Sequence, residues 1–340
     1  MNILLLGAAG SAGINFARAV QPRHTVIGVD HNPTMHPLAA CQMERLHPGR
    51  DKLGQVNQLI LDWDVDLVHA QPDLEVAWLA ENQHLIAAKT LVPHPEVVRV
   101  CQDKLALAQA LGRDLCPRSY HVSIGAFREA LHDEAWMRLR RGAGSMGALP
   151  VRSWGMVEQW LDHWHRERDM LADEWMLAEI LPGRDLSWTG VYRDGSLLAS
   201  ACKERVEPMG ASRHPANVAS TACVQTIVAR PDVNGRCEEA VRRLDPDADG
   251  VWMFDLRENA QGVPLVTECN VGRFGTTSLF WKAAGGNLPL MLVSSLDPWP
   301  LARAVPDRDC CRVGATWLRT ADAEPMLDVR VAHQAVPVAA

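Results

Sequence analysis

Two segments that lie far apart in the chain carry the residue types that could do chemistry. Residues 138–147 read Arg-Leu-Arg-Arg-Gly-Ala-Gly-Ser-Met-Gly, and residues 267–273 read Thr-Glu-Cys-Asn-Val-Gly-Arg. Glycines lack a Cβ, so backbone N–H groups of the first segment can converge on an anion while its arginines neutralise the charge. The second segment offers a carboxylate and an amide that could hold a divalent cation. Together the two segments indicate chemistry on ATP.

The second segment is the more specific of the two because it reads as a strand. In an extended chain, Val266, Glu268 and Asn270 project from one face. Asp255 lies on the preceding β-prone run, where it can pair alongside Glu268. Two carboxylates and an amide oxygen suit Mg²⁺, and Mn²⁺ is an alternative ion. Exposed polar residues on a hairpin would explain any one of the three residues, but explain the set less well.

A glycine run near the start of the chain suggests a second kind of nucleotide site. Gly7, Gly10 and Gly13 follow an apolar run, and Asp30 ends the next one. This pattern imitates the dinucleotide fingerprint, in which glycines approach a pyrophosphate and the acid holds a ribose. A tight strand-to-helix turn with close packing explains the same glycines at least as well.

Composition excludes some functional classes. The 340 residues are 47% hydrophobic, with a formal net charge of -7 and a pI near 6.0. Nucleic-acid binding needs concentrated Lys and Arg, so we expect no nucleic-acid partner. No apolar stretch is long enough to span a bilayer, and the first residues lack the basic start and cleavage site of a signal peptide. We therefore expect a cytoplasmic protein with no membrane partner.

Hydrophobic patterns predict the elements that must position these residues. Alternating strands and helices indicate a parallel sheet over residues 1–95. Its predicted strands are residues 2–6, 25–29 and 65–70, and its predicted helices are residues 14–20 and 75–88.

Further along the chain, the elements become mixed. A helix is predicted from about residue 101 to 112, with Asp103 and Lys104 in its first turn. Strands are predicted at 135–139, 174–181, 186–192, 197–202, 251–256 and 264–269, and a helix at 156–166 whose tryptophan stripe indicates core packing. Asp194-Gly195 joins two of these strands as a hairpin turn. The tail beyond residue 298 is expected to be irregular.

The order and spacing of these pieces resemble an ATP-grasp enzyme, specifically one synthetase half of the carbamoyl-phosphate synthase large subunit. The likeness covers most of residues 1–292. It rests on the N-terminal glycine turn, Asp103-Lys104, residues 138–147, Glu179 to Asp185, Asp255, Glu268-x-Asn270 and residues 278–289.

The resemblance implies an α/β and α+β fold in two parts. A Rossmann-like pre-ATP-grasp domain would occupy residues 1–95, and a two-lobed ATP-grasp domain residues 96–300. Within the latter, the lid lobe would span about 116–178 and the C-terminal lobe about 179–300. Residues 301–340 would form a tail.

The resemblance also implies roles for individual residues. The expected ATP-binding residues are Lys104, Arg138, Arg140, Gly142, Gly144, Ser145, Gly147, Glu179, Leu181 and Asp185. Asp255, Glu268 and Asn270 would coordinate the metal. Arg273 would stabilise an acyl phosphate, although it comes one position later than in the family's Glu-x-Asn-x-Arg pattern.

The activity so implied is that of an ATP-dependent carboxylate–amine ligase, which forms an amide or peptide-like bond through an acyl phosphate. Its partners would be a small carboxylate and an amine, with a homodimer possible. The chain holds one synthetase half rather than two, so carbamoyl phosphate synthesis is not expected. The alternatives are a nicotinamide-dependent oxidoreductase and a non-catalytic nucleotide-binding protein.

Substrate-binding residues are harder to identify. Arg205 is a candidate for a substrate carboxylate, although Lys203, Glu204 and Arg205 could equally form a solvated cluster. His214 matches a region close to the synthase active site. Asp73, at a predicted strand end, is interpreted as a helix cap.

Overall fold

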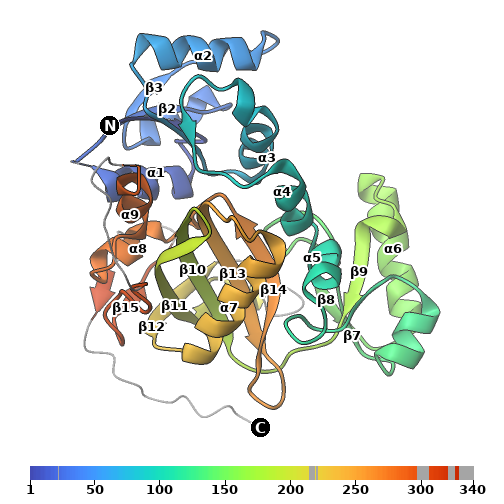
Figure 1. Ribbon diagram of the computed structural model, residues 1–340. Coiled ribbons are helices and arrows are strands. Elements are labelled where there is room, and N and C mark those ends of the chain that lie inside the picture. The colour runs from blue at the N-terminus through green and yellow to red at the C-terminus, as the bar shows by residue number, and fades with distance from the viewer. Residues whose placement is uncertain (22, 214–218, 220, 297–305, 321–325, 329–340) are drawn as a thin grey trace.

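The computed structural model describes residues 1–21, 23–213, 219, 221–296, 306–320 and 326–328. Three β-sheets organise this part of the chain. Figure 1 shows the N-terminal sheet at one end, the largest sheet in the centre and the smallest to one side. None of the described helices is long and apolar enough to cross a bilayer. The mixed α/β class predicted from the sequence is confirmed.

The N-terminal sheet is parallel, with the strand order β3-β2-β1-β4-β5. Its strands are β1 (Asn2–Leu6), β2 (Thr25–Val29), β3 (Gln42–Glu44), β4 (Leu67–Ala70) and β5 (Lys89–Thr90), and its helices are α1 (Ser11–Val20), α2 (Lys52–Asp62) and α3 (Asp73–Asn82). The strands predicted at residues 2–6 and 25–29 are confirmed. From Ile3 to Leu6, β1 is apolar and buried on both faces, with Leu4 and Leu6 in one core cluster and Ile3 and Leu5 in another.

The largest sheet has the strand order β14-β13-β10-β11-β12-β15-β16. Its strands are β10 (Asp185–Arg193), β11 (Ser196–Pro208), β12 (Ala222–Val228), β13 (Gly250–Glu258), β14 (Pro264–Val271), β15 (Thr316–Leu318) and β16 (Met326–Asp328). Both predicted hairpins are present as β10–β11 and β13–β14. The tail was expected to be irregular, but its described part adds β15 and β16 to the sheet, because β15 pairs with β12.

Helices cover both faces of this sheet. α7 (Pro231–Leu244) packs on one face, where its Val233 joins Trp188 and Phe254 in a core cluster. α8 (Ser278–Ala283) and α9 (Leu288–Ser294) cover part of the other face, where Trp281 lies in a cluster with Ala201. The rest of that second face is free to line a cavity.

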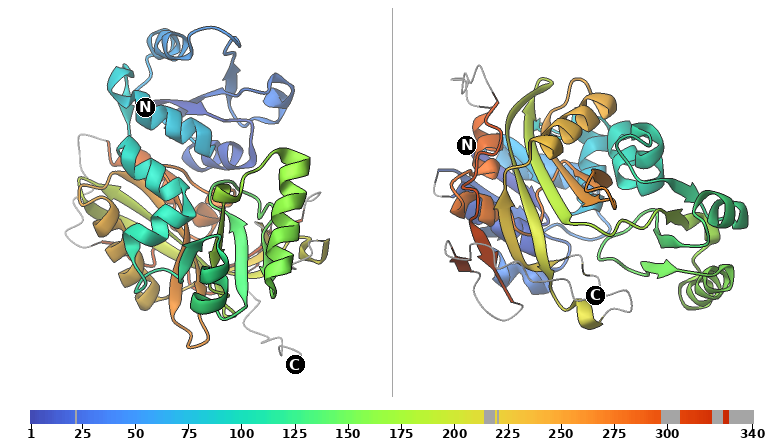
Figure 2. Two further views of the ribbon diagram at one scale, coloured as in Figure 1. Left: turned by 90° about the vertical axis from the view of Figure 1, so that its right-hand side faces the viewer. Right: turned by 90° about the horizontal axis from the view of Figure 1, so that it is seen from below.

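The smallest sheet has the strand order β6-β9-β7-β8. Its strands are β6 (Ser119–His121), β7 (Ala135–Leu139), β8 (Leu149–Val151) and β9 (Trp175–Ala178), and α6 (Trp154–Arg168) packs against it. The tryptophan stripe of α6 lies in this core as predicted, with Trp160 and Trp164 beside Val157. Figure 2 shows this unit standing apart from the largest sheet, connected through α5 and the strand linkers.

The helix predicted around Asp103 is wrong in its start. α4 (Pro95–Gln102) ends just before Asp103, and α5 (Lys104–Leu111) begins just after it. The Asp103 carboxylate caps α5 by accepting hydrogen bonds from the backbone N–H of Leu105 (3.1 Å) and Ala106 (3.2 Å). It also forms an ion pair with Arg140 at 2.7 Å. The cap fixes Lys104 as the first residue of the helix.

Replacing Asp103 with alanine is expected to lower the free energy of unfolding by about 2–4 kcal/mol, because the change removes a helix cap and unpairs Arg140. Urea unfolding measures the loss. Asp51→Ala is the matched control, since Asp51 caps α2 through Leu53 and Gly54 but is exposed. It is expected to cost only about 0.5–2 kcal/mol. Equal losses in the two variants would contradict a stabilising ion pair.

The predicted alternation along β14 is wrong at one position. Asp255 pairs with Glu268 as predicted, but the next register pair is Leu256 with Val266, so Thr267 is bulged out. The extra residue shifts the faces of the strand. Val266 therefore lies in the core with Cys269, while Glu268 and Asn270 line the opposite cavity.

Candidate functional site

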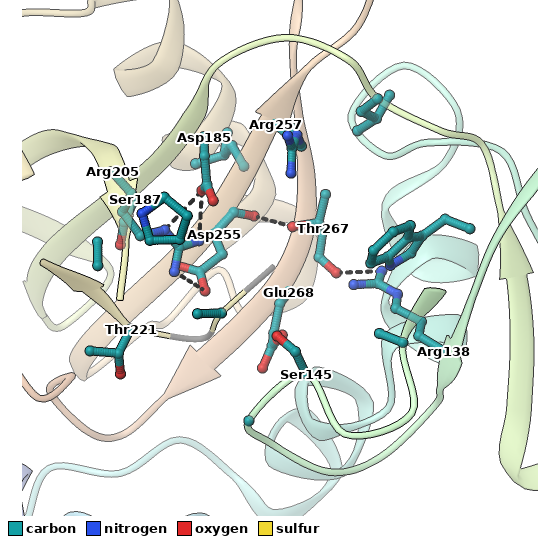
Figure 3. A pocket seen from close by; sticks show the side chains of 18 of the residues that line it. Arg138, Ser145, Asp185, Ser187, Arg205, Thr221, Asp255, Arg257, Thr267 and Glu268 are labelled. Atoms are coloured by element: carbon teal, nitrogen blue, oxygen red, sulfur yellow. Dashed lines mark hydrogen bonds and ion pairs between the residues drawn. The ribbon is translucent and has the colours of Figure 1, made fainter. Parts of the chain in front are cut away.

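A cavity of about 860 Å³ separates the smallest sheet from the uncovered face of the largest sheet. Its lining includes residues of strands β7 to β14, of the loop after β7 and of the start of α5. Figure 3 shows the cluster of charged side chains inside it. Segments separated by more than a hundred residues thus meet at one site.

Lys104 brings a buried cation to the cavity, and Arg138 a half-buried one. The Lys104 ammonium donates to the carbonyl oxygen of Gly142 at 2.9 Å and lies 3.7 Å from a Glu268 carboxylate oxygen. Arg138 donates to the carbonyl oxygen of Thr267 at 2.8 Å, as Figure 3 shows. Burial lowers the pKa of each group, and nearby Glu268 opposes this effect in both. The Arg138 Nε is buried and has no hydrogen-bond partner among the described residues, so it can bind an acceptor from a ligand.

The loop after β7 lies along the cavity, and Gly142, Gly144 and Ser145 all line it. Each has a positive φ, of 123°, 78° and 56° respectively, so the two glycines adopt conformations that other residues avoid. Backbone N–H groups in such conformations can form an anion-binding concavity. The loop therefore lines the same cavity as Lys104 and Arg138, and its role as a phosphate-binding lid stays a prediction.

Two predicted ATP-binding residues lie elsewhere. Arg140 is engaged with Asp103 and with the carbonyl oxygen of Asp173 at 3.0 Å, and it does not line the cavity. Gly147 also lies outside the lining, where its carbonyl oxygen accepts a hydrogen bond from the Trp160 indole at 2.8 Å. A Cβ on Gly147 would approach the Trp175 ring to 2.6 Å. Both residues therefore hold the loop to the rest of the protein on the side away from the cavity.

Asp255, Glu268 and Asn270 all line the cavity from the hairpin of β13 and β14. Asp255 faces Glu268 across the hairpin, and Asn270 pairs with Met253. Glu268 and Asn270 share a face because they are two residues apart in the strand, and the bulge at Thr267 sets Glu268 opposite Asp255. Hard oxygen donors converging in a cavity fit the requirements of Mg²⁺, so the residues present are compatible with the predicted ion.

The linker from β9 to β10 forms an apolar wall at one end of the cavity. Leu181 is buried there, and Trp136 and Leu256 line the cavity near it. Glu179 also lines the cavity, but its carboxylate accepts a hydrogen bond from Arg118 Nε at 3.1 Å. Apolar walls with a few polar groups are typical of pockets for a flat aromatic ligand.

Asp185 lines the cavity beyond that wall. Burial raises the pKa of its carboxyl, and the nearby Arg205 guanidinium opposes this effect. Arg257 faces the cavity close to Asp185 in the sheet, and its Nε is buried with no partner in the part of the chain that the structure describes. Sequence reasoning missed Arg257, although its position two residues after Asp255 places both on one strand face.

Arg205 stays a candidate ligand for a substrate carboxylate, and in the structure it pairs with acidic side chains of the cavity. Its guanidinium donates to Asp185 at 2.8 Å and to Asp255 at 3.3 Å (Figure 3). Burial acts to lower the pKa of Arg205, but Asp255 and Asp185 outweigh it and raise the pKa. The alternative of a solvated charge cluster is wrong, because Lys203 is buried and Arg205 largely so.

Arg273 ties the N-terminal sheet to the metal-ligand candidates. Its guanidinium forms an ion pair with Asp73 and donates a hydrogen bond to the Asn270 side-chain oxygen. The interpretation of Asp73 as a helix cap is wrong, because Pro72 holds the cap position of α3 and Asp73 is its first residue. Arg273 lines the cavity, whereas His214 lies outside the described residues.

In the N-terminal glycine turn, neighbouring side chains and backbone groups occupy the positions that a dinucleotide would need. The Asp30 carboxylate accepts hydrogen bonds from the backbone N–H of Ala9 (3.1 Å) and Asn32 (3.0 Å). A Cβ on Gly13 would lie 2.3 Å from the carbonyl oxygen of Gly7, so helix and turn pack too closely for a side chain there. These contacts are those of the tight strand-to-helix turn.

Comparison with known proteins gives matches to solved structures. No family model and no curated protein matches the sequence. The biotin carboxylase domain of the Hydrogenobacter thermophilus 2-oxoglutarate carboxylase, crystallised as a dimer with MgADP, ADP and bicarbonate, superposes with a TM-score of 0.68 at 11% identity. The match covers 93% of this chain and 73% of that one.

Two further structures cover the same share of this chain. The L-amino acid ligase from Bacillus licheniformis has a TM-score of 0.68 at 13% identity, over 93% of this chain and 78% of that one. The N5-carboxyaminoimidazole synthetase from Staphylococcus aureus, complexed with ADP, has a TM-score of 0.67 at 13% identity, over 93% and 81%. At sequence identities this low, the superpositions establish a shared fold and nothing further. This protein has the ATP-grasp fold.

Proposed function

We propose that this protein is an ATP-dependent carboxylate–amine ligase. One observation carries the proposal: Lys104, Arg138 and the glycine loop lie in the same cavity as the Asp255–Glu268 acidic pair. Cations and backbone N–H groups suit the triphosphate, while the acidic pair suits its divalent counterion. The three structural relatives differ in the substrates their names give, so the fold alone does not choose the acid or the amine.

In this proposal the cavity divides between the parts of ATP. The apolar wall around Leu181 receives the adenine, Asp185 and Arg257 lie toward the ribose, and Lys104 and Arg138 bind the phosphates. Residues of the lid lobe, about 116–178, close over the nucleotide and exclude water. The domain division at about residue 95 and the lobe division at about residue 179 belong to the same proposal.

The reaction proceeds in two steps. A carboxylate oxygen of the acid attacks the γ-phosphorus of ATP, the bond from that phosphorus to the bridging oxygen breaks, and ADP leaves with the electron pair. The amine nitrogen then attacks the acyl carbon, phosphate leaves with the electrons of the carbon–oxygen bond, and the nitrogen loses a proton. Without the first step, carboxylate oxygen is too poor a leaving group for the second.

The residues of the chain act mainly by position and charge. Arg138 and Lys104 stabilise negative charge on the transferring phosphoryl group. Mg²⁺, held by Asp255, Glu268 and Asn270, would add Lewis-acid stabilisation of the phosphate oxygens. Arg205 holds the Asp255 carboxylate in place, and Arg273 orients the Asn270 side-chain oxygen through its hydrogen bond.

A panel of carboxylic acids, each with and without candidate amines, is expected to reveal acid-dependent ADP release from Mg-ATP. Hydroxylamine should trap the acyl phosphate as a hydroxamate, and mass spectrometry should identify the amide product. Chelation with EDTA should abolish turnover and added Mg²⁺ should restore it. ATP binding in a calorimeter without ADP release across the panel would point instead to a non-catalytic nucleotide-binding protein. Binding of NAD but not ATP would point to an oxidoreductase.

A further inference from the structure

Two cations at the far side of the cavity have no ionic partner in the described part of the chain. The Lys203 side chain donates its hydrogen bond to Thr277 Oγ1, and its ammonium lies 4.8 Å from the centre of the Trp281 ring. Arg319 donates to Thr276 Oγ1 at 3.3 Å and to the carbonyl oxygen of Ala222 at 3.1 Å. Both residues line the cavity. They converge on consecutive threonines, so their charges lie close together.

Such an arrangement is unfavourable without a ligand. Lys203 is only 5% exposed, and burial lowers the pKa of its ammonium to about 7, with Arg205 and Arg319 acting in the same direction and Asp255 against them. Burial also lowers the pKa of Arg319. Unpaired charges removed from water are costly, and a bound anion is the simplest group that neutralises both. The neutral polar side chain of Gln225, also buried, lines the cavity near them.

The position of these cations separates them from the phosphoryl-transfer centre. Lys203 lies on β11, two strands from Asp255 on β13, and Arg319 follows β15, which is two strands farther on. Neighbouring strands are about 4.8 Å apart, so the strand of Lys203 lies roughly 10 Å from that of Asp255. The Arg205 guanidinium donates hydrogen bonds to Asp185 on β10, the strand between β11 and β13, and to Asp255 on β13. The reacting carboxylate must meet the γ-phosphorus beside the metal ligands, so an anion at Lys203 and Arg319 is a different group.

We propose that Lys203 and Arg319 form an anion subsite for a second, non-reacting acidic group on the acid substrate. This inference rests on the proposed ligase function and deepens it. The substrate class is a small carboxylic acid that carries a further carboxylate or phosphate. The two acidic groups are separated by roughly 5–10 Å, about one to two strand spacings. The reacting carboxylate lies toward Glu268 and Asn270, and the second group lies between the Thr276–Thr277 turn and the two cations.

The test compares matched acids in the ADP-release assay. Propionate, butyrate, valerate and hexanoate represent monoacids, succinate, glutarate and adipate represent dicarboxylates, and 3-phosphoglycerate represents a phosphorylated acid. The parent protein is expected to prefer diacids over monoacids of equal length by roughly 10- to 100-fold in kcat/KM, the range typical of charge-assisted hydrogen bonds. Comparison of the dicarboxylates with 3-phosphoglycerate shows whether the subsite binds a carboxylate or a phosphate.

Lys203→Met and Arg319→Met are expected to abolish this preference while leaving the low monoacid activity within about twofold. Arg319→Lys should restore part of the preference because it keeps the charge. Arg312→Met is the matched control, since Arg312 is exposed on the same segment and should change nothing. ATP binding in the calorimeter should be the same in all five proteins, which shows that each variant is folded.

Several outcomes would overturn the subsite. Equal losses for monoacids and diacids would place the reacting carboxylate itself at Lys203 and Arg319. Losses that follow an acidic group on the amine would assign the subsite to the amine. If the parent releases no ADP with any acid, the proposed function fails, but calorimetric binding of succinate and 3-phosphoglycerate to the parent and to Arg319→Met still tests the subsite. Equal binding to the two proteins rejects it.

Discussion

Glu268→Gln is expected to reduce acid-dependent ADP release by roughly 100- to 1000-fold, the loss typical when one pre-organised electrostatic contact is removed from a phosphoryl-transfer or acyl-transfer site. Glutamine keeps the size of the side chain but removes the negative charge that would hold Mg²⁺. It also removes the carboxylate 3.7 Å from the Lys104 ammonium, so the pKa of Lys104 should fall further. The deficit should be partly rescued by raised Mg²⁺ concentration.

Steady-state ADP release at varied Mg²⁺ measures this effect. Glu167→Gln provides the control, because Glu167 is exposed on α6 and the same chemical change there should leave the rate unaltered. The double variant Glu268→Gln, Asn270→Ala should release ADP more slowly still. Unchanged ADP formation in the double variant with the true substrate would reject the metal assignment.

Lys203→Met is expected to increase stability while it destroys the preference for diacids. Burial lowers the pKa of Lys203 from its ordinary 10.5 to about 7, and a displacement of that size corresponds to on the order of 5 kcal/mol of unfavourable energy for the charged form. Methionine fills a similar volume without the charge. At pH 6, where Lys203 is protonated in both the folded and the unfolded chain, the variant should therefore be more stable by up to several kcal/mol.

The pH dependence of this difference follows from proton binding. Between about pH 7 and pH 10.5 the unfolded chain keeps the Lys203 proton while the folded protein has released it. The parent should therefore gain stability as pH rises through this window, and its deficit relative to Lys203→Met should shrink. Urea unfolding at pH 6 and pH 9 measures both proteins. A variant less stable than the parent at pH 6 would mean that Lys203 has a structural role rather than the proposed one.

Stability and substrate binding thus make opposite demands on the same side chain. A buried cation without a counterion is the kind of local cost that functional sites retain. A structural lysine, in contrast, would be expected to form an ion pair with a carboxylate, as Lys52 does with Glu75 at 2.5 Å. The contrast supports the assignment of Lys203 to a ligand.

Local sequence patterns identified much of the fold. β1 and β2 follow directly from continuous apolar runs, and the β10–β11 hairpin from Asp194-Gly195, because strand length and turn type are decided by neighbouring residues. The β13–β14 hairpin was predictable for the same reason, but its undisturbed register would set Asp255 opposite Thr267, so the pairing with Glu268 arises from the bulge. Lys104, Arg138 and the glycine loop were also identified, and the structure brings them to one cavity.

Other features depended on contacts that no local pattern encodes. The bulge at Thr267 sends Val266 into the core and keeps Glu268 beside Asp255, and its position is decided by pairing with β13. Arg140 lies in a run of cations beside the glycine loop, yet Asp103 draws its guanidinium away from the cavity. Spacing alone could not distinguish these environments.

The amino-acid sequence by itself determined the strands, the hairpins and the residue types suited to phosphates and a divalent cation, because these depend on near neighbours in the chain. Only the tertiary structure decided which cations remain unpaired. Arg205 and Arg273 are neutralised by Asp185, Asp255 and Asp73, whereas Lys203 and Arg319 meet only hydroxyl, carbonyl and aromatic groups among the described residues. Charge pairing is a property of three-dimensional proximity, and it is this pairing that points to the substrate.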